Sequence, residues 1–176
     1  MKRPALWVAV ALAVVVALFV VVLATRQPAT DRQVKSPLLG HTAPVVGGPT
    51  IAGATFTLPT RPGEFVLVNF FATWCVPCQQ EHDELARFAL AHQVAGDATV
   101  VSVVFSDDVN AVKQYFSQRG GDWPVVRDDD GALATAWGVA RVPESYLVGP
   151  DGIVKVKITG GVSFNGLQAL LSKAQS

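Results

Sequence analysis

The stretch Phe65–Glu81 decides the fold and reads FVLVNFFATWCVPCQQE. Its first seven residues are nearly all apolar and rich in aromatic and β-branched side chains, a pattern that predicts a strand covered on both faces. Over residues 77–93 apolar side chains recur near one face at helical spacing, which predicts a helix. The sequence therefore places Cys75 and Cys78 at the start of a helix that follows a buried strand.

These are the only two cysteines of the chain, and they are three positions apart. Thiols at i and i+3 of a first helical turn lie on the same side and can form a disulfide. Closing so small a loop stabilises a fold by only about 2 kcal/mol before strain is subtracted, so reversible redox chemistry is the better explanation for the pair. A disulfide-rich miniprotein would need more bridges, and a structural zinc site would need a second ligand pair, which is not formed at metal-like spacing by His41, His82 and His92.

The start of a helix acts differently on the two thiols. Its unpaired N–H groups and positive dipole end favour a thiolate on Cys75, lower the pKa of that thiol and make it the attacking nucleophile. Cys78, one turn inside and expected to be less exposed, resolves the mixed disulfide. Val76 and Pro77 set the surroundings of the thiolate and the rigidity of the turn, and proline suits a first turn. Glu81 follows on the same face and can accept the proton of Cys78, or it can simply complement the helix N-terminus.

The rest of the chain alternates strands and helices around this segment. The patterns predict an N-terminal hairpin at 51–58, strands at 99–105, 125–126, 145–148 and 153–158, and helices at about 108–120, 132–137 and 164–174. Such alternation, ending in an antiparallel hairpin, predicts an α/β fold with a central mixed sheet and helices on both faces.

Composition indicates one soluble domain behind an apolar N-terminal segment. The chain has 176 residues, about one domain's length, and much of its hydrophobic excess lies in the 19 uncharged residues Leu6–Ala24. Beyond Lys2 and Arg3 the chain carries 12 basic and 14 acidic residues, a net charge of −2. That balance gives no basic surface for nucleic acid, and we expect no nucleic-acid partner.

The apolar run is longer than the core of a signal peptide and long enough to span a bilayer. We expect residues 1–25 to form a signal anchor or transmembrane helix, residues 26–37 a linker, and residues 38–176 the folded domain. Cleavage after Ala24 stays open as an alternative. Charge alone also leaves the orientation open, because basic residues follow the run at Arg26, Arg32 and Lys35. The thiol chemistry favours a domain outside the cytoplasm.

Some conspicuous residues have ordinary interpretations. We expect His82 and His92 to be plain helix residues, and Trp123 and Trp137 to serve in packing. The run Asp128–Asp130 lacks the alternating spacing of a calcium loop and is interpreted as a solvated turn. Trp74 is different, because its place beside Cys75 suits shielding of the thiol or contact with substrate as well as packing.

Two segments resemble a known family. Phe71–Glu81, with Phe-x-x-Trp-Cys-x-x-Cys after a buried strand, is similar to the active-site segment of the thioredoxin superfamily, and more narrowly of the membrane-tethered TlpA, ResA and CcmG (DsbE) group. Gly138–Val148 resembles that group's cis-proline loop and the following strand. The resemblance covers about residues 38–174. It implies a thioredoxin fold with an N-terminal β-hairpin and an inserted strand–helix unit around residues 99–127.

The resemblance also implies roles for matching residues. Cys75 and Cys78 correspond to the nucleophilic and resolving thiols, and Glu81 to the group's active-site acid. Pro143 matches the cis-proline, which would expose the Val142 backbone for strand-like pairing with a substrate segment. The remaining substrate-binding candidates are Trp74, Val76, Pro77 and Glu144, the last matching an acid that often follows the proline. One departure is Asp83, where many relatives carry a helix-kinking proline.

These implications define an expected function. We expect an extracytoplasmic thiol–disulfide oxidoreductase in a bacterial cytoplasmic membrane, without a metal or cofactor, that reduces disulfides of partner proteins. The resemblance implies apocytochrome c as substrate and a membrane thiol-reducing protein as electron donor. Two alternatives stay open: a disulfide oxidase for secreted proteins, and a copper metallochaperone or redox sensor on the same fold. Copper carriers of this topology use three residues between their cysteines and a distal histidine, whereas this chain has two residues and no obvious partner histidine.

Overall fold

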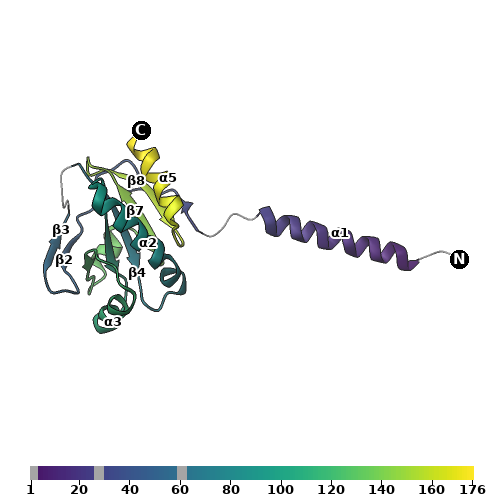
Figure 1. Ribbon diagram of the computed structural model, residues 1–176, viewed down its shortest axis with the longest axis horizontal. Coiled ribbons are helices and arrows are strands. Elements are labelled where there is room, and N and C mark those ends of the chain that lie inside the picture. The colour runs from purple at the N-terminus through teal and green to yellow at the C-terminus, as the bar shows by residue number, and fades with distance from the viewer. Residues whose placement is uncertain (1–3, 26–29, 59–62) are drawn as a thin grey trace.

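The computed structural model describes residues 4–25, 30–58 and 63–176, and within the first range it describes the side chains of residues 7–22 (Figure 1). The strands are β1 (Arg32–Gln33), β2 (Gly47–Pro49), β3 (Thr55–Thr57), β4 (Phe65–Phe71), β5 (Ala98–Val104), β6 (Val125–Val126), β7 (Glu144–Val148) and β8 (Val154–Thr159). The helices are α1 (Pro4–Thr25), α2 (Val76–Ala95), α3 (Val109–Arg119), α4 (Ala132–Ala136) and α5 (Phe164–Gln175).

The sheet is mixed, as predicted. Its order is β1-β8-β7-β4-β5-β6, with β4, β5 and β6 parallel to one another and β7, β8 and β1 antiparallel to their neighbours. Every residue of β4 is buried, because this strand has a strand on each side and side chains packed on both faces. The carboxyl end of β4 leads directly toward the two cysteines, so a fully buried strand positions them.

Helices cover both faces of the sheet. Helices α2 and α5 lie side by side on one face, where Leu85 and Phe88 of α2 pack with Leu67 of β4 and Leu171 of α5 (Figure 1). The other face is covered by α4 and by residues from 38 to 58, around a cluster of large aromatic rings: Phe70, Trp137 and Tyr146. Burying a large apolar side chain contributes roughly 2 kcal/mol, so these clusters hold the sheet rigid beneath the site.

Local sequence signals set the limits of α2. Cys75 is its N-cap, Pro77 occupies the first turn, and Gly96 ends the helix in a left-handed conformation with its N–H donating to His92 O at 2.7 Å. Proline costs nothing in a first turn because the N–H that it lacks has no partner inside a helix. The two thiols are therefore fixed at the first turn of a helix whose termini are both capped.

Two boundaries differ from the sequence prediction. The hairpin at 51–58 begins earlier: its first strand is β2, and residues 51–53 form the turn into β3. The linker assigned to 26–37 is not structureless where the structure describes it, because Arg32 and Gln33 pair with Thr159 and Ile158 at the edge of the sheet. Two paired residues give no periodicity, which is why sequence reasoning missed this strand. Residues 26–29 lie outside the described part of the chain.

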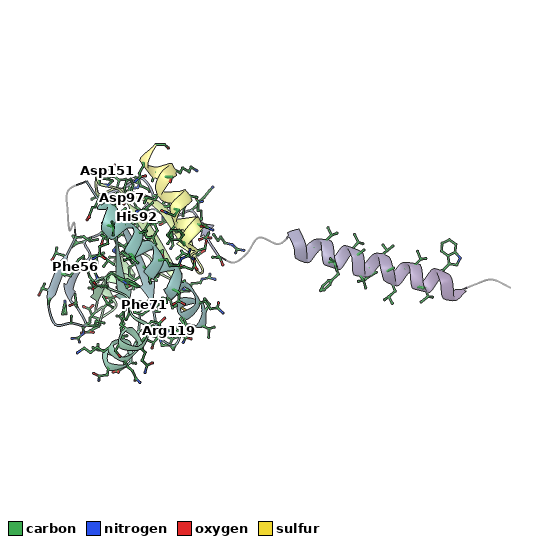
Figure 2. All side chains as sticks on the ribbon, viewed as in Figure 1. Phe56, Phe71, His92, Asp97, Arg119 and Asp151 are labelled. Atoms are coloured by element: carbon green, nitrogen blue, oxygen red, sulfur yellow. A yellow bond between two sulfur atoms is a disulfide. The ribbon has the colours of Figure 1, made fainter. Side chains whose placement is uncertain are left out.

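The N-terminal helix α1 stands apart from the sheet domain, and its described apolar side chains project without packing on it (Figure 2). A membrane-spanning helix was expected here. Among the residues that the structure describes, no helix is long and apolar enough to cross a membrane.

Candidate active site

The two cysteines form a disulfide at the N-terminus of α2. Their sulfurs are 2.14 Å apart and their Cα atoms 5.2 Å apart. The backbone N–H of Cys78 donates to Sγ of Cys75 at 3.2 Å, so a helix-terminal donor is directed at the sulfur expected to be the nucleophile. The expected difference in exposure is not seen, since Cys75 is 5% and Cys78 4% exposed in this oxidised state. Exposure in this state therefore does not distinguish the two sulfurs, whereas the helix-terminal donor does.

The residues before the disulfide are tied to the loop that follows β5. The carboxylate of Asp107 accepts hydrogen bonds from Thr73 N at 2.5 Å and from Thr73 Oγ1 at 2.7 Å. Trp74 Nε1 donates to Ser106 O at 3.1 Å. Sequence reasoning gave Asp107 no role at the site; its neighbour Asp108 is the N-cap of α3. The ties fix the backbone that enters the first turn of α2.

An apolar surface adjoins the disulfide. Trp74 is 57% and Val76 60% exposed, and Pro77 beside them is exposed as well. The indole ring keeps its N–H bonded to Ser106 O, so its body is held in place while it faces solvent. These three predicted contact residues therefore lie together at the surface, where a partner protein can reach them.

Glu81 is the buried acid of the site. It is 2% exposed, and its carboxylate accepts hydrogen bonds from Asn69 Nδ2 and from Val162 N, both at 2.9 Å. Burial raises the pKa of Glu81 to about 8, because the two hydrogen bonds only partly offset the loss of hydration and Asp31 adds a repulsive charge. A carboxyl with such a pKa can exchange a proton near neutral pH. The alternative that Glu81 merely complements the helix N-terminus requires a carboxylate that stays ionised, which this burial disfavours.

A polar row beneath α2 holds Asn69 in position. Asn69 Nδ2 donates to Ser145 Oγ at 3.0 Å as well as to Glu81, and Ser102 Oγ, itself bonded by Trp123 Nε1 at 2.8 Å, lies 3.4 Å from Asn69 Oδ1. These contacts fix which end of the amide faces the acid. Sequence reasoning missed Asn69, although an amide in the middle of an otherwise apolar strand is a visible signal.

The loop before β7 lines a groove beside the site. The Val142–Pro143 peptide bond is cis, as the resemblance implied, and Val142 packs against the cluster that contains both cysteines. The groove has a volume of about 540 Å³, and Pro77 and Glu81 of α2 face Val142 and Pro143 across it. Neither the backbone N–H nor the C=O of Val142 has a hydrogen-bond partner among the described residues. An extended peptide laid in the groove could use them.

Glu144 is not where a substrate contact would require it. The side chain is 2% exposed on the face of the sheet opposite α2, and its Oε2 lies 2.9 Å from Lys157 Nζ in an ion pair too oblique for a hydrogen bond. Side chains alternate across a strand, so in β7 it is Ser145, not Glu144, that points toward Glu81. Glu144 is a buried structural partner of Lys157.

The other conspicuous side chains act within the fold. His82 is buried among Tyr115, Phe116 and Trp123, and desolvation lowers its pKa. His92 Nδ1 lies 2.6 Å from Asp97 Oδ1, and His92 is in the last turn of α2, at the opposite end of that helix from the disulfide. His92 and Asp97 are labelled in Figure 2. Asp128 caps α4 through the N–H groups of residues 133 and 134, Trp137 packs in the core, and Asp83 is exposed. Within the described ranges, no group of three or more His, Cys, Asp or Glu side chains could hold a metal ion.

Comparison with known proteins is consistent with this geometry. The family model described as Redoxin matches residues 38–171. The chain is 30% identical to the thiol:disulfide interchange protein DsbE of Pseudomonas fluorescens biotype C, over 91% of this chain and 86% of that protein. It is 31% identical to the thiol-disulfide oxidoreductase ResA of Bacillus subtilis, over 61% of this chain and 60% of that protein.

The matched share of the other protein differs between a further relative and a solved structure. The chain spans about half, 51%, of the thiol:disulfide interchange protein CycY of Rhizobium leguminosarum, with 35% identity over 56% of its own length. Among solved structures, a thioredoxin-family thiol:disulfide interchange protein from Chlorobium tepidum superposes with a TM-score of 0.71 and 25% identity, covering 81% of this chain and 100% of that one. The sheet order and flanking helices are those of a thioredoxin fold.

Proposed function

The chain belongs to the redoxin family and is a thiol–disulfide oxidoreductase, and on that premise we propose that it is a membrane-anchored enzyme that reduces protein disulfides outside the cytoplasm. The observation that carries the proposed reaction is the Cys75–Cys78 disulfide at a helix N-terminus, one turn from a buried carboxyl whose pKa is about 8. A thiolate, a resolving thiol and a proton acceptor then lie on adjoining turns of one helix.

The proposed reaction begins with both cysteines reduced. The Cys75 thiolate attacks one sulfur of the substrate disulfide, that S–S bond breaks, and a mixed disulfide forms as one substrate thiolate leaves. Cys78 then gives its proton to the Glu81 carboxylate and attacks Sγ of Cys75, releasing the second substrate thiolate. Two electrons pass to the substrate and the Cys75–Cys78 disulfide forms. A thiol-reducing protein of the membrane must return two electrons, and Glu81 releases its proton.

The role of Glu81 is tested by Glu81→Gln, which keeps the shape of the side chain but cannot accept the proton. We expect the resolving step to slow by roughly 10²-fold when the decay of a mixed disulfide with a cysteine peptide is followed by rapid mixing. Asp83→Asn, an exposed carboxylate on the same helix, is the matched control and should leave the rate within a factor of about 2. Equal rates for wild type and Glu81→Gln would remove Glu81 from the mechanism.

The direction of electron flow is tested by the reduction potential of the disulfide. The proposal requires a value nearer to about −270 mV, as for reducing thioredoxins, than to about −120 mV, the oxidising end of the superfamily. Equilibration with thiol buffers of known potential gives the value. A result at the oxidising end would support the disulfide oxidase in place of the reductase.

We propose apocytochrome c as the substrate, because the active-site segment and the cis-proline loop resemble those of the CcmG and ResA group. An extended segment that carries cysteines suits the apolar surface of Trp74, Val76 and Pro77. It also suits the Val142 backbone, which has no hydrogen-bond partner in the described part of the chain. A Cys78→Ala variant expressed in cells should accumulate mixed disulfides with c-type apocytochromes, whereas Cys75→Ala should trap nothing. Trapped partners without paired cysteines would contradict this assignment.

The proposed anchor rests on the sequence, in which the 19 uncharged residues Leu6–Ala24 follow Lys2 and Arg3. The full chain should stay with membranes after washing at alkaline pH, and protease added from outside the cytoplasm should digest the domain. Release into the soluble fraction would overturn the anchor without affecting the redox proposal.

A further inference from the structure

Asp31, in the segment ahead of β1, forms hydrogen bonds with the turn between β8 and α5. Its backbone N–H donates to Gly161 O at 2.8 Å, and its carboxylate accepts from Ser163 N at 2.8 Å and from Ser163 Oγ at 2.6 Å. Asp31 has a φ of 59°, a left-handed conformation that is uncommon for a residue other than glycine. The residue is thus bound on both sides of Val162, at Gly161 and at Ser163.

Val162 lies between Gly161 and Ser163, the two residues bound by Asp31, and contacts the active-site acid Glu81. Its N–H donates to Glu81 Oε2 at 2.9 Å, and the residue is buried. An N–H donor favours the charged form of a buried carboxyl only while its direction is fixed. Because the three bonds of Asp31 fix the residues before and after Val162, they hold this donor on the acid.

Gly166 gives an independent indication that the carboxylate of Asp31 belongs in this place. A Cβ at Gly166 would overlap the carboxylate atoms of Asp31. Gly166 lies in the first turn of α5, where its N–H donates to Ser163 Oγ at 3.0 Å and where alanine would otherwise be a better helix former. The glycine therefore leaves room for the docked aspartate.

We propose that Asp31 is a positioning residue. Its carboxylate packs against Gly166, and its three hydrogen bonds to Gly161 and Ser163, here called the clasp, hold the Val162 N–H on Glu81. The segment that precedes the domain thereby completes the acid–base site. This rests on the proposed role of Glu81. Asp31 lies ahead of residue 38, where the family match begins, so these hydrogen bonds join the preceding segment to the matched domain.

Asp31 acts on Glu81 in two opposite ways, and this makes the clasp testable. Its negative charge disfavours ionisation of Glu81, whereas the Val162 donor that it holds favours ionisation. Asn69 of β4 also donates to Glu81, and Arg32, Glu84 and Arg141 line the same groove. None of these residues is itself altered when Asp31 is substituted.

The test measures the titration midpoint of Glu81 by carbon NMR of its carboxyl group, in the oxidised full-length chain. Asp31→Asn removes the charge but keeps an acceptor for Ser163 N, so the midpoint should fall by about 0.5 pH units. Asp31→Ala also removes the clasp, and because a direct hydrogen bond to the carboxylate outweighs a more distant charge, the midpoint should rise by about one unit. A fall in both variants would mean that Asp31 acts through its charge alone, and would overturn the clasp.

Gly166→Ala is a second route to the same result, which matters if Asp31→Ala folds poorly. It keeps the charge but displaces the carboxylate, so the midpoint should again rise by about one unit. In the Asp31→Ala background the same substitution should have no further effect, because nothing is left to displace. An equal effect of Gly166→Ala with and without Asp31 would overturn the proposal.

The rate of mixed-disulfide resolution against pH separates this inference from the proposed function. If Glu81 is the proton acceptor, the rate profile should shift with its midpoint in every variant. If Glu81→Gln resolves at the wild-type rate, the acid has no catalytic role, yet the NMR midpoints still decide whether Asp31 positions the Val162 donor.

Discussion

Two carboxyl groups are buried on opposite faces of the same sheet, and their surroundings differ in one respect. Glu81, on the buried face of α2, accepts hydrogen bonds from two neutral donors, Asn69 Nδ2 and Val162 N. Glu144, on the other face, lies 2.9 Å from the Lys157 ammonium. Both side chains are only 2% exposed. Burial alone therefore does not decide what a carboxyl does here.

The two glutamates therefore have different roles in one fold: Glu144 is the ion-pair partner of Lys157, and Glu81 can exchange a proton near neutral pH. Desolvation raises the pKa of Glu81 to about 8, because the hydrogen bonds from Asn69 and Val162 only partly offset the lost hydration. Near Glu144, interactions with Tyr146 and with the Glu144 carboxylate raise the pKa of Lys157 above its usual value in spite of desolvation, so the ammonium keeps its charge. The first group can take part in acid–base chemistry, and the second pair ties β7 to β8.

The largest effect should come from breaking the ion pair. Lys157→Met leaves the Glu144 carboxylate buried without a cation and should lower the free energy of unfolding by about 4 kcal/mol, measured by urea unfolding of the oxidised protein. Lys155→Met, an exposed lysine of the same strand, is the control and should cost less than about 1 kcal/mol. The double variant Glu144→Leu/Lys157→Met should recover most of the loss, and a single-variant loss below about 1 kcal/mol would contradict the comparison.

The next effect concerns the pH dependence of stability. The pKa of Glu81 is raised from 4.5 to about 8 on folding, so its contribution is complete below about pH 4.5 and is lost as the pH rises through 8. The loss should amount to about 3 kcal/mol between about pH 5 and pH 8. Glu81→Gln lacks it, so its stability relative to wild type should increase by that amount over the same window. Parallel stability curves for the two oxidised proteins would show that Glu81 titrates normally.

The smallest effect sharpens the comparison at a single hydrogen bond. Asn69→Ala removes the amide donor and should raise the pKa of Glu81 further, by about one unit, in an NMR titration of the carboxyl group. Ser145→Ala keeps the bond between Asn69 and Glu81 and should move the midpoint by less than about 0.3 units. A lower midpoint in Asn69→Ala would mean that the amide stabilises the protonated acid instead.

The part of the site that is local in sequence could be predicted. Cys75, Cys78 and Glu81 follow one another at three-residue spacing on a capped helix, so their common face follows from helix geometry. The cis bond before Pro143 followed from resemblance, because nothing in the residues alone distinguishes it. Trp74, Val76 and Pro77 lie beside the disulfide because they adjoin it in the chain.

The part that depends on distant segments was missed or misplaced. Asn69 meets Glu81 across 12 positions, and Asp107 meets Thr73 across 34. Asp31 meets Ser163 across 132 positions, from a segment that sequence reasoning had assigned to a linker. Glu144 was placed at the substrate surface because it follows the proline, whereas strand alternation turns it to the opposite face.

Sequence by itself determined that two thiols lie at the N-terminus of one helix, which follows a strand apolar enough to be fully buried. This placement indicates that the protein exchanges disulfides. Tertiary structure alone decided the state of the acid behind them. The proton affinity of Glu81 depends on how much water α5, the sheet and the N-terminal segment remove from around it, and on which donors they leave within reach. Desolvation belongs to the packed surroundings of a group and not to its place in the chain, so it becomes readable only when those surroundings are known.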